Sequence, residues 1–130
     1  MNKFNLGNIV FSNKSNFVLI GGVNVLESKD FAIHTAGVYK DICKKLEIPL
    51  IFKASYDKAN RSSFNSFRGP GIIKGMEIFN EIKKCHSLPI VTDVHNIEEA
   101  KIASEFCDII QIPAFLACLL YTSDAADDGV

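Results

Sequence analysis

The sequence lacks any apolar run close to the roughly 18 uninterrupted residues that a membrane-spanning helix needs. Its polar start, MNKFNLGN, also lacks the charged and apolar regions of a signal peptide. These two absences predict a protein that has no membrane partner and that works in the cytoplasm.

The four cysteines, at positions 43, 85, 107 and 118, show neither a CxxC pair nor the spacing of a zinc site. Such scattered cysteines are typical of reduced thiols in a reducing compartment, most of them in a protein core. We therefore predict no metal site from them, and we expect no cofactor.

The formal net charge of −1 gives the chain no long-range attraction for nucleic acid. Many of the basic residues lie instead in one stretch, which contains a single acid, Asp57, and five basic residues: Lys53, Lys58, Arg61, Arg68 and Lys74. This local excess suits a small phosphorylated metabolite better than a nucleic acid. The 130 residues, 48% of them apolar, are enough for one domain with a real core.

The stretch from Ile51 to Pro70, IFKASYDKANRSSFNSFRGP, is the most informative part of the chain. A short apolar strand delivers Lys53 into a polar loop without sustained periodicity, and connections of this length are usually functional or disordered. Tyr56, Phe64 and Phe67 offer apolar anchors, which favours an ordered anion-binding loop. A solvated basic loop without a ligand is the alternative, and Arg68 in particular could be structural.

The rest of the chain alternates short apolar runs with helical patterns after a hairpin signal at Phe4 to Phe11. Strands are predicted at 17–20, 50–52, 90–92 and 109–112, with the first buried on both faces. Helices are predicted to begin after Ser28, at Ile72 and after Asn96, which can cap a helix with Glu98 and Glu99 in its first turn. The first helix should cover the sheet with an apolar face made of Phe31, Thr35, Val38, Ile42 and Leu46. His34 and His86 are expected on the surface.

Strands that alternate with helices predict a parallel α/β sheet, either doubly wound or a (β/α)8 barrel. Five polar residues fall at or just past the ends of the four predicted strands: Asn24, Lys53, Asp93, His95 and Gln111. Active sites of (β/α)8 barrels lie at this carboxyl face, and contributions from four consecutive strands favour the barrel.

Several motifs then carry a family resemblance between Phe17 and Ala117. They are GGVNVLES at 21–28, FKAS at 52–55, KANRSS at 58–63, SFRGPG at 66–71, TDVH at 92–95 and QIPAFL at 111–116. Together they resemble the 3-deoxy-D-manno-octulosonate 8-phosphate (Kdo8P) synthases, which share a (β/α)8 barrel fold with the DAHP synthases.

The resemblance implies condensation of phosphoenolpyruvate with D-arabinose 5-phosphate and water. It implies that Lys53, Ser55, Lys58 and Gln111 bind phosphoenolpyruvate, and that Asn60, Arg61, Ser62 and Phe115 bind arabinose 5-phosphate. Asp93 and His95 would lie against the sugar hydroxyls and the reacting aldehyde. The catalytic set implied in this way is Asn24, Lys58, Asp93 and His95, in an enzyme that assembles as a homotetramer.

Family members with Cys at the position of Asn24 depend on a metal, whereas members with Asn do not. A neutral amide is a weak ligand for the zinc or iron that a thiolate holds well. The resemblance therefore implies a metal-independent enzyme, although Asn24 could equally form hydrogen bonds within the turn after the first strand.

The sequence matches the family only up to Ala117, and a (β/α)8 barrel typically needs about 250 residues. We therefore expect a hairpin extension at 1–16, the first half of a barrel at 17–117 and a non-native tail at 118–130. An open half-sheet exposes a strand edge and apolar surface, so the chain is expected to be inactive and poorly folded. A DAHP synthase-like enzyme, which usually carries KPRT where this chain has KANR, and a non-catalytic phosphate-binding fragment are the alternatives.

Overall fold

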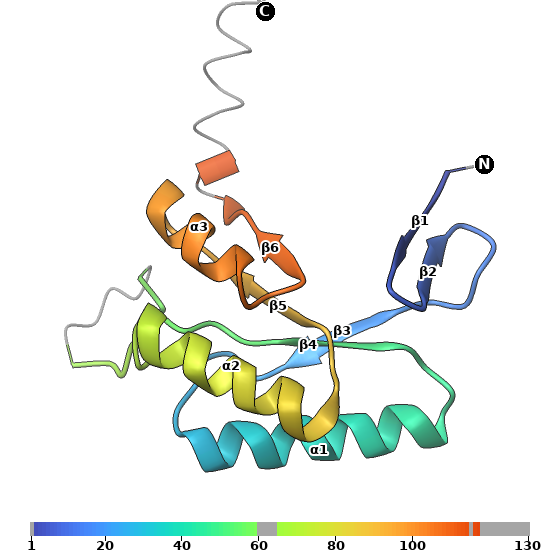
Figure 1. Ribbon diagram of the computed structural model, residues 1–130, viewed down its shortest axis with the longest axis horizontal. Coiled ribbons are helices and arrows are strands. Elements are labelled where there is room, and N and C mark those ends of the chain that lie inside the picture. The colour runs from blue at the N-terminus through green and yellow to red at the C-terminus, as the bar shows by residue number, and fades with distance from the viewer. Residues whose placement is uncertain (1, 60–64, 115, 118–130) are drawn as a thin grey trace, which may run out of the picture.

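The computed structural model describes residues 2–59, 65–114 and 116–117. Its centre is a sheet of four parallel strands in the order β3 (Leu19–Gly22), β4 (Leu50–Lys53), β5 (Ile90–Asp93) and β6 (Ile109–Gln111). Helix α1 (Lys29–Lys45) connects β3 to β4, α2 (Ile72–His86) connects β4 to β5, and α3 (Ile97–Ser104) connects β5 to β6 (Figure 1). The prediction of an α/β fold with the first four units of a parallel barrel is confirmed.

A small antiparallel hairpin of β1 (Lys3–Leu6) and β2 (Ile9–Ser12) precedes the sheet, also as predicted. Gly7 takes a positive φ of 55° in its two-residue turn, and the rings of Phe4 and Phe11 stack with centroids 4.3 Å apart. The hairpin lies at the opposite end of the molecule from the long loop that follows β4 (Figure 1).

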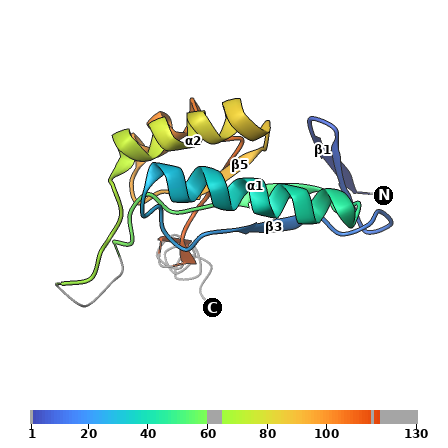
Figure 2. The same ribbon diagram turned by 90° about the horizontal axis from the view of Figure 1, so that it is seen from below.

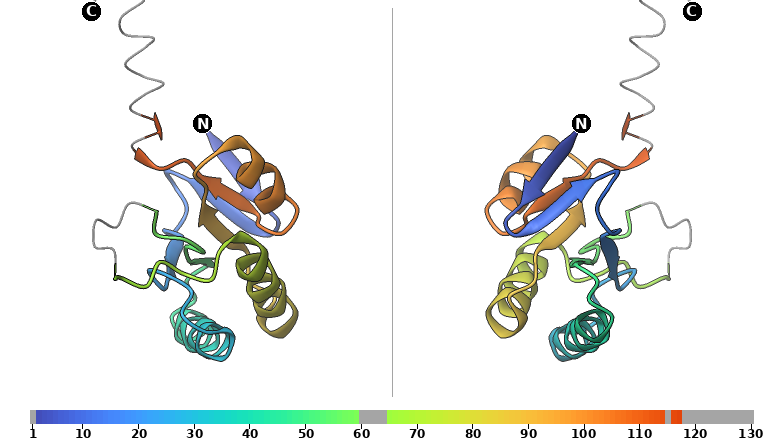
Figure 3. Two further views of the ribbon diagram at one scale, coloured as in Figure 1. Left: turned by 90° about the vertical axis from the view of Figure 1, so that its left-hand side faces the viewer. Right: turned by 90° about the vertical axis from the view of Figure 1, so that its right-hand side faces the viewer.

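The helices lie together on one side of the sheet, with α1 and α2 side by side (Figures 2 and 3). The main core fills the space between them and the sheet. Phe52 and Ile90 contribute to it from the strands, while Phe79 and Ile82 contribute from α2, and all four are fully buried. Within the described residues, no helix is long and apolar enough to cross a membrane.

The apolar face predicted for α1 is wrong by one position. Phe31, Val38 and Ile42 are 47%, 43% and 52% exposed, whereas Ala32 and Ala36 are fully buried against the sheet side. Both rows repeat at helical spacing, so periodicity alone does not separate them. The small alanines let the helix approach the strands closely, and the larger side chains lie on the adjacent row.

Helix α1 is fixed to β3 and to α2 by specific contacts. The Tyr39 hydroxyl donates to the carbonyl of Gly22 over 3.1 Å, and the His86 imidazole lies 2.8 Å from the carbonyl of Ile33 through its Nε2. His86 is thus partly buried between two helices, so its predicted surface position is wrong, whereas His34 is exposed as predicted. The Ser28 hydroxyl caps α1 by accepting from the amide of Phe31, as predicted.

The first barrel strand begins and ends two residues later than predicted, because Gly21 and Gly22 belong to it and do not terminate it. Gly22 pairs with Lys53, and a Cβ atom added there would lie 2.0 Å from the Lys53 carbonyl oxygen. Only glycine allows this close approach of the two backbones. The strand is also not buried on both faces, since Ile20 is 52% exposed.

We predict that Gly22→Ala destabilises the fold by about 1–3 kcal/mol, because the new methyl group overlaps backbone that cannot move aside. Gly21→Ala is the matched control: its Cβ would meet the ring edge of Tyr39 at 3.0 Å, and a side chain can shift. Urea unfolding followed by far-ultraviolet circular dichroism compares the two midpoints. An equal loss in both variants would contradict the role assigned to Gly22.

Candidate functional site

A cavity of about 740 Å³ opens at the carboxyl ends of β4, β5 and β6. Its lining residues include four that the sequence singled out at strand ends and one from the basic loop. The lining consists of Lys53, Lys58, Ala59, Asp93, His95, Gln111, Pro113 and Ala114. The parallel register explains this convergence, because Asp93 pairs with Gln111 and Lys53 lies on the neighbouring strand.

Two residues that line the cavity, Lys53 and Asp93, form a hydrogen-bonded cluster with Ser55. The Lys53 ammonium donates to Asp93 Oδ1 over 2.9 Å and to Ser55 Oγ over 3.2 Å. The Ser55 hydroxyl donates to the same carboxylate oxygen over 2.5 Å, and Ser55 itself is fully buried. Charge-assisted bonds of this kind are short and strong, and they fix all three side chains before any ligand arrives.

Burial alone would raise the pKa of Asp93, but the hydrogen bonds from Ser55 and Lys53, together with the Lys53 charge, hold that pKa below its ordinary value. Asp93 is therefore ionised at neutral pH. A lowered carboxyl pKa stabilises the fold above the ordinary aspartate value of about 3.9. This contribution is lost as the pH falls through the lowered pKa of Asp93.

His95 stands between two carboxylates. Its Nε2 lies 3.7 Å from Asp93 Oδ2, while its Nδ1 lies 3.0 Å from Glu99 Oε2. The backbone amide of His95 donates to the same Glu99 oxygen over 3.0 Å, and the Tyr56 hydroxyl donates to it over 2.7 Å. The Tyr56 ring also meets the imidazole edge to face, with centroids 5.8 Å apart.

Glu99 and Tyr56 are site residues that sequence reasoning missed, since it took Glu99 for an acid of the first helical turn and Tyr56 for an apolar anchor. Burial raises the pKa of Glu99, yet the hydrogen bonds from Tyr56 and His95 lower it on balance, so Glu99 is a carboxylate. Burial, followed by the bond to Glu99, raises the pKa of Tyr56, which stays a neutral donor. One sequence signal could have indicated the contact between His95 and Glu99: the two residues are four positions apart at the start of a helix that Asn96 caps.

Arg68 joins the two flanks of the loop after β4. Of the two roles considered for it, anion binding and a structural contact, this arrangement favours the structural contact. The guanidinium makes two bonds to the Asp57 carboxylate, both of 2.9 Å, and the Arg68 carbonyl accepts from the amide of Lys58 over 2.7 Å. Arg68 therefore has a structural role, and it holds Lys58 near the cavity.

The remaining predicted residues divide into three groups. Lys58 and Gln111 line the cavity, and their contacts with phosphoenolpyruvate stay predictions. Asn24 follows β3 at the same end of the sheet, but it is exposed and is not among the described residues that line the cavity. Asn60, Arg61, Ser62 and Phe115 lie outside the described residues.

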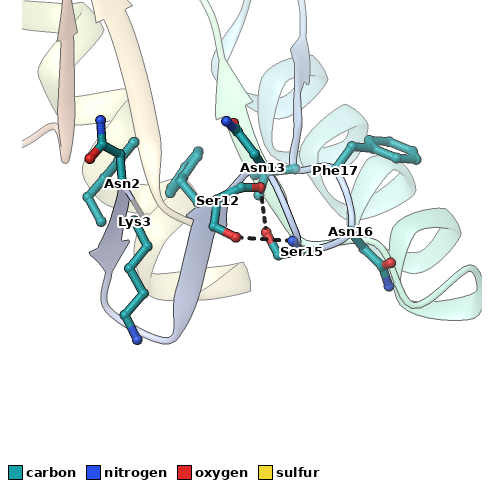
Figure 4. A pocket seen from close by; sticks show the side chains of 10 residues that line it. Asn2, Lys3, Ser12, Asn13, Ser15, Asn16 and Phe17 are labelled. Carbon is teal, nitrogen blue, oxygen red and sulfur yellow. Dashed lines mark hydrogen bonds between the residues drawn. The ribbon is translucent and has the colours of Figure 1, made fainter.

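A second hollow of about 450 Å³ lies between the hairpin and the segment that leads into β3, at the other end of the strands (Figure 4). Its serines serve the local turn: Ser12 Oγ accepts from the amides of Lys14 and Ser15, and the Ser15 hydroxyl donates to the Ser12 carbonyl. Lys3 is the one charged side chain among its described lining residues. The cavity at the carboxyl face is therefore the better candidate.

Comparison with known proteins identifies the family. The DAHP synthetase I family model matches residues 3–119. A Prochlorococcus marinus (strain MIT 9313) protein named 2-dehydro-3-deoxyphosphooctonate aldolase is 62% identical over 112 residues, which is 86% of this chain and 40% of that protein.

Proteins of the same name in Acinetobacter baylyi and Shewanella baltica (strain OS155) are 60% and 56% identical, over 86% and 87% of this chain. The chain covers 39% and 40% of their lengths, so it spans about 40% of the curated relatives that it matches. The motifs that carry the resemblance and the parallel sheet that gathers them at one face agree with this match, and the chain belongs to the DAHP synthetase I family.

Proposed function

We propose that this chain forms the phosphoenolpyruvate-binding part and contributes to the sugar phosphate-binding part of a Kdo8P synthase. The enzyme would join phosphoenolpyruvate to D-arabinose 5-phosphate, with water consumed and inorganic phosphate released. The names of the relatives at 56–62% identity support a role in making the same eight-carbon product.

The observation that carries the proposal is the convergence of Lys53, Lys58, Asp93 and His95 on one cavity. Phosphoenolpyruvate brings a phosphate and a carboxylate, which need fixed cationic donors, and Lys53 and Lys58 supply two ammonium groups. The new bond joins the enol carbon to the aldehyde carbon, where a hydroxyl forms. Asp93 and His95 are polar groups that would form hydrogen bonds to the sugar and transfer a proton at the oxygen of that carbon.

The predicted binding residues divide into two sets, one for each of the two phosphorylated substrates. Lys53, Ser55, Lys58 and Gln111 would surround phosphoenolpyruvate, and three of these four line the cavity. Asn60, Arg61, Ser62 and Phe115 would hold arabinose 5-phosphate, with the Arg61 fork suited to phosphate oxygens. Asn60 in KANR favours a five-carbon aldose phosphate over the substrate of a DAHP synthase.

The test is a chimaera that joins residues 1–117 to the remaining part of the Prochlorococcus marinus relative. We expect the chimaera to release phosphate only when both phosphoenolpyruvate and arabinose 5-phosphate are present. We also expect it to be a homotetramer and to be found in the cytoplasm. A chimaera that prefers an aldose phosphate of another length would favour the DAHP synthase-like alternative. A folded chimaera that binds these ligands without turnover would favour a non-catalytic role.

We predict that the 130-residue chain alone does not turn over, because it spans about 40% of its relatives and a barrel site is assembled from more strands than these four. Phosphate release is measured with both substrates present, with the chimaera as the positive control. Clear turnover that depends on arabinose 5-phosphate would sink this prediction.

In the chimaera, Arg61→Ala should mainly weaken the use of arabinose 5-phosphate, by roughly 2–5 kcal/mol, since the phosphate loses its charged partner. Lys53→Ala should mainly weaken the use of phosphoenolpyruvate. Arg68→Ala serves as a control for loop disruption, because Arg68 pairs with Asp57. Steady-state kinetics with each substrate varied in turn would refute the division of roles if they gave the opposite assignment.

Asn24 leads to a prediction about metal, since an amide at this position is a poor ligand. The chimaera should keep its activity after treatment with a strong chelator, and Asn24→Cys should gain affinity for zinc, because a thiolate is a strong ligand. Activity is measured before and after chelation and after divalent metal is returned. Loss on chelation followed by recovery with metal would overturn the metal-independent assignment.

A further inference from the structure

One oxygen of Glu99 contacts three polar groups, which come from two segments of the fold. The Tyr56 hydroxyl just after β4 and the backbone amide of His95 just after β5 donate to this oxygen, and the ring Nδ1 of His95 lies 3.0 Å from it. Tyr56 is 1% exposed, and the His95 side chain is 14% exposed, so these bonds are shielded from water. Glu99 itself is held at the start of α3, because its amide donates to the Asn96 side chain over 2.8 Å.

We propose that Glu99 is a positioning residue that holds the neutral His95 imidazole with its proton on Nδ1. An ionised carboxylate can only accept, so the ring nitrogen that faces it must donate. The other nitrogen, Nε2, lies 3.7 Å from Asp93 Oδ2, beyond hydrogen-bond distance, so in a neutral ring whose proton is on Nδ1 it carries no proton, at the wall of the cavity. Tyr56 fixes Glu99 in turn, which links the end of β4 to the orientation of the ring.

The inference rests on the proposed function for what His95 does in the reaction: a neutral ring with unprotonated Nε2 can accept a proton from a bound substrate or water. The geometry of the ring does not depend on that role. A purely structural explanation is that Glu99 only closes the start of α3, as an acid at the third helical position often does. The protonation pattern of the ring separates the two explanations, because a cap alone leaves it undetermined.

The experiment is nitrogen-15 NMR of the 130-residue chain with labelled histidine, in sucrose to favour the folded state, at a pH where the imidazole is neutral. The His95 signals are those lost in His95→Gln. We expect a protonated Nδ1, an unprotonated Nε2 and a downfield Nδ1 proton that exchanges slowly. The opposite pattern in the wild-type chain would overturn the proposal.

In Glu99→Ala, the protonated Nδ1 signal should be lost and the two nitrogen shifts should converge or reverse, while an unchanged pattern in a folded variant would refute the proposal. Should Glu99→Ala unfold α3, the isosteric Glu99→Gln decides: its neutral oxygen should move the Nδ1 proton upfield, and an unmoved proton would count against the carboxylate. Glu98→Ala, in the same helical turn, is the matched control and should leave His95 unchanged. An equal change there would mean a general effect of the helix end.

Discussion

The ion pair between Lys53 and Asp93 joins the ends of two neighbouring strands, and the candidate site is built around it. Lys53 is the last residue of β4 and Asp93 is the last residue of β5. The parallel register brings Lys53 Nζ to 2.9 Å from Asp93 Oδ1. Both side chains are largely buried, so the pair requires further polar partners to offset the loss of hydration. Ser55 provides one for both members, which explains a fully buried hydroxyl beside a strand end.

The close approach of β3 to β4 sets the other constraint on the site. Gly22 allows its backbone to lie against Lys53, and the amide of Val23 donates to the Lys53 carbonyl over 3.0 Å. The backbone that carries the ammonium is therefore held from both sides, by β3 and by β5. A bulkier residue at Gly22 would displace Lys53 as well as the strand, so the stability of the fold and the position of the Lys53 ammonium depend on the same glycine.

Sequence patterns located the strand ends well, because apolar runs followed by Lys53, Asp93 and Gln111 mark both a buried strand and its polar exit. They failed where two patterns overlap. On α1 the rows of Ala32 and Phe31 have the same period, and only packing against the sheet selects the smaller residues. Glu99 and Tyr56 were missed because their roles depend on a contact between residues 43 positions apart.

These contacts give the site its order before any substrate is present. From Tyr56 through Glu99 to His95, and from Ser55 and Lys53 to Asp93, each side chain faces a neighbour of complementary charge or hydrogen-bonding type. Preorganised donors and acceptors stabilise developing charge without the cost of rearrangement during the reaction. The ion pair of Arg68 and Asp57 fixes the described flanks of the loop after β4 through a contact that is separate from the cluster at the strand ends.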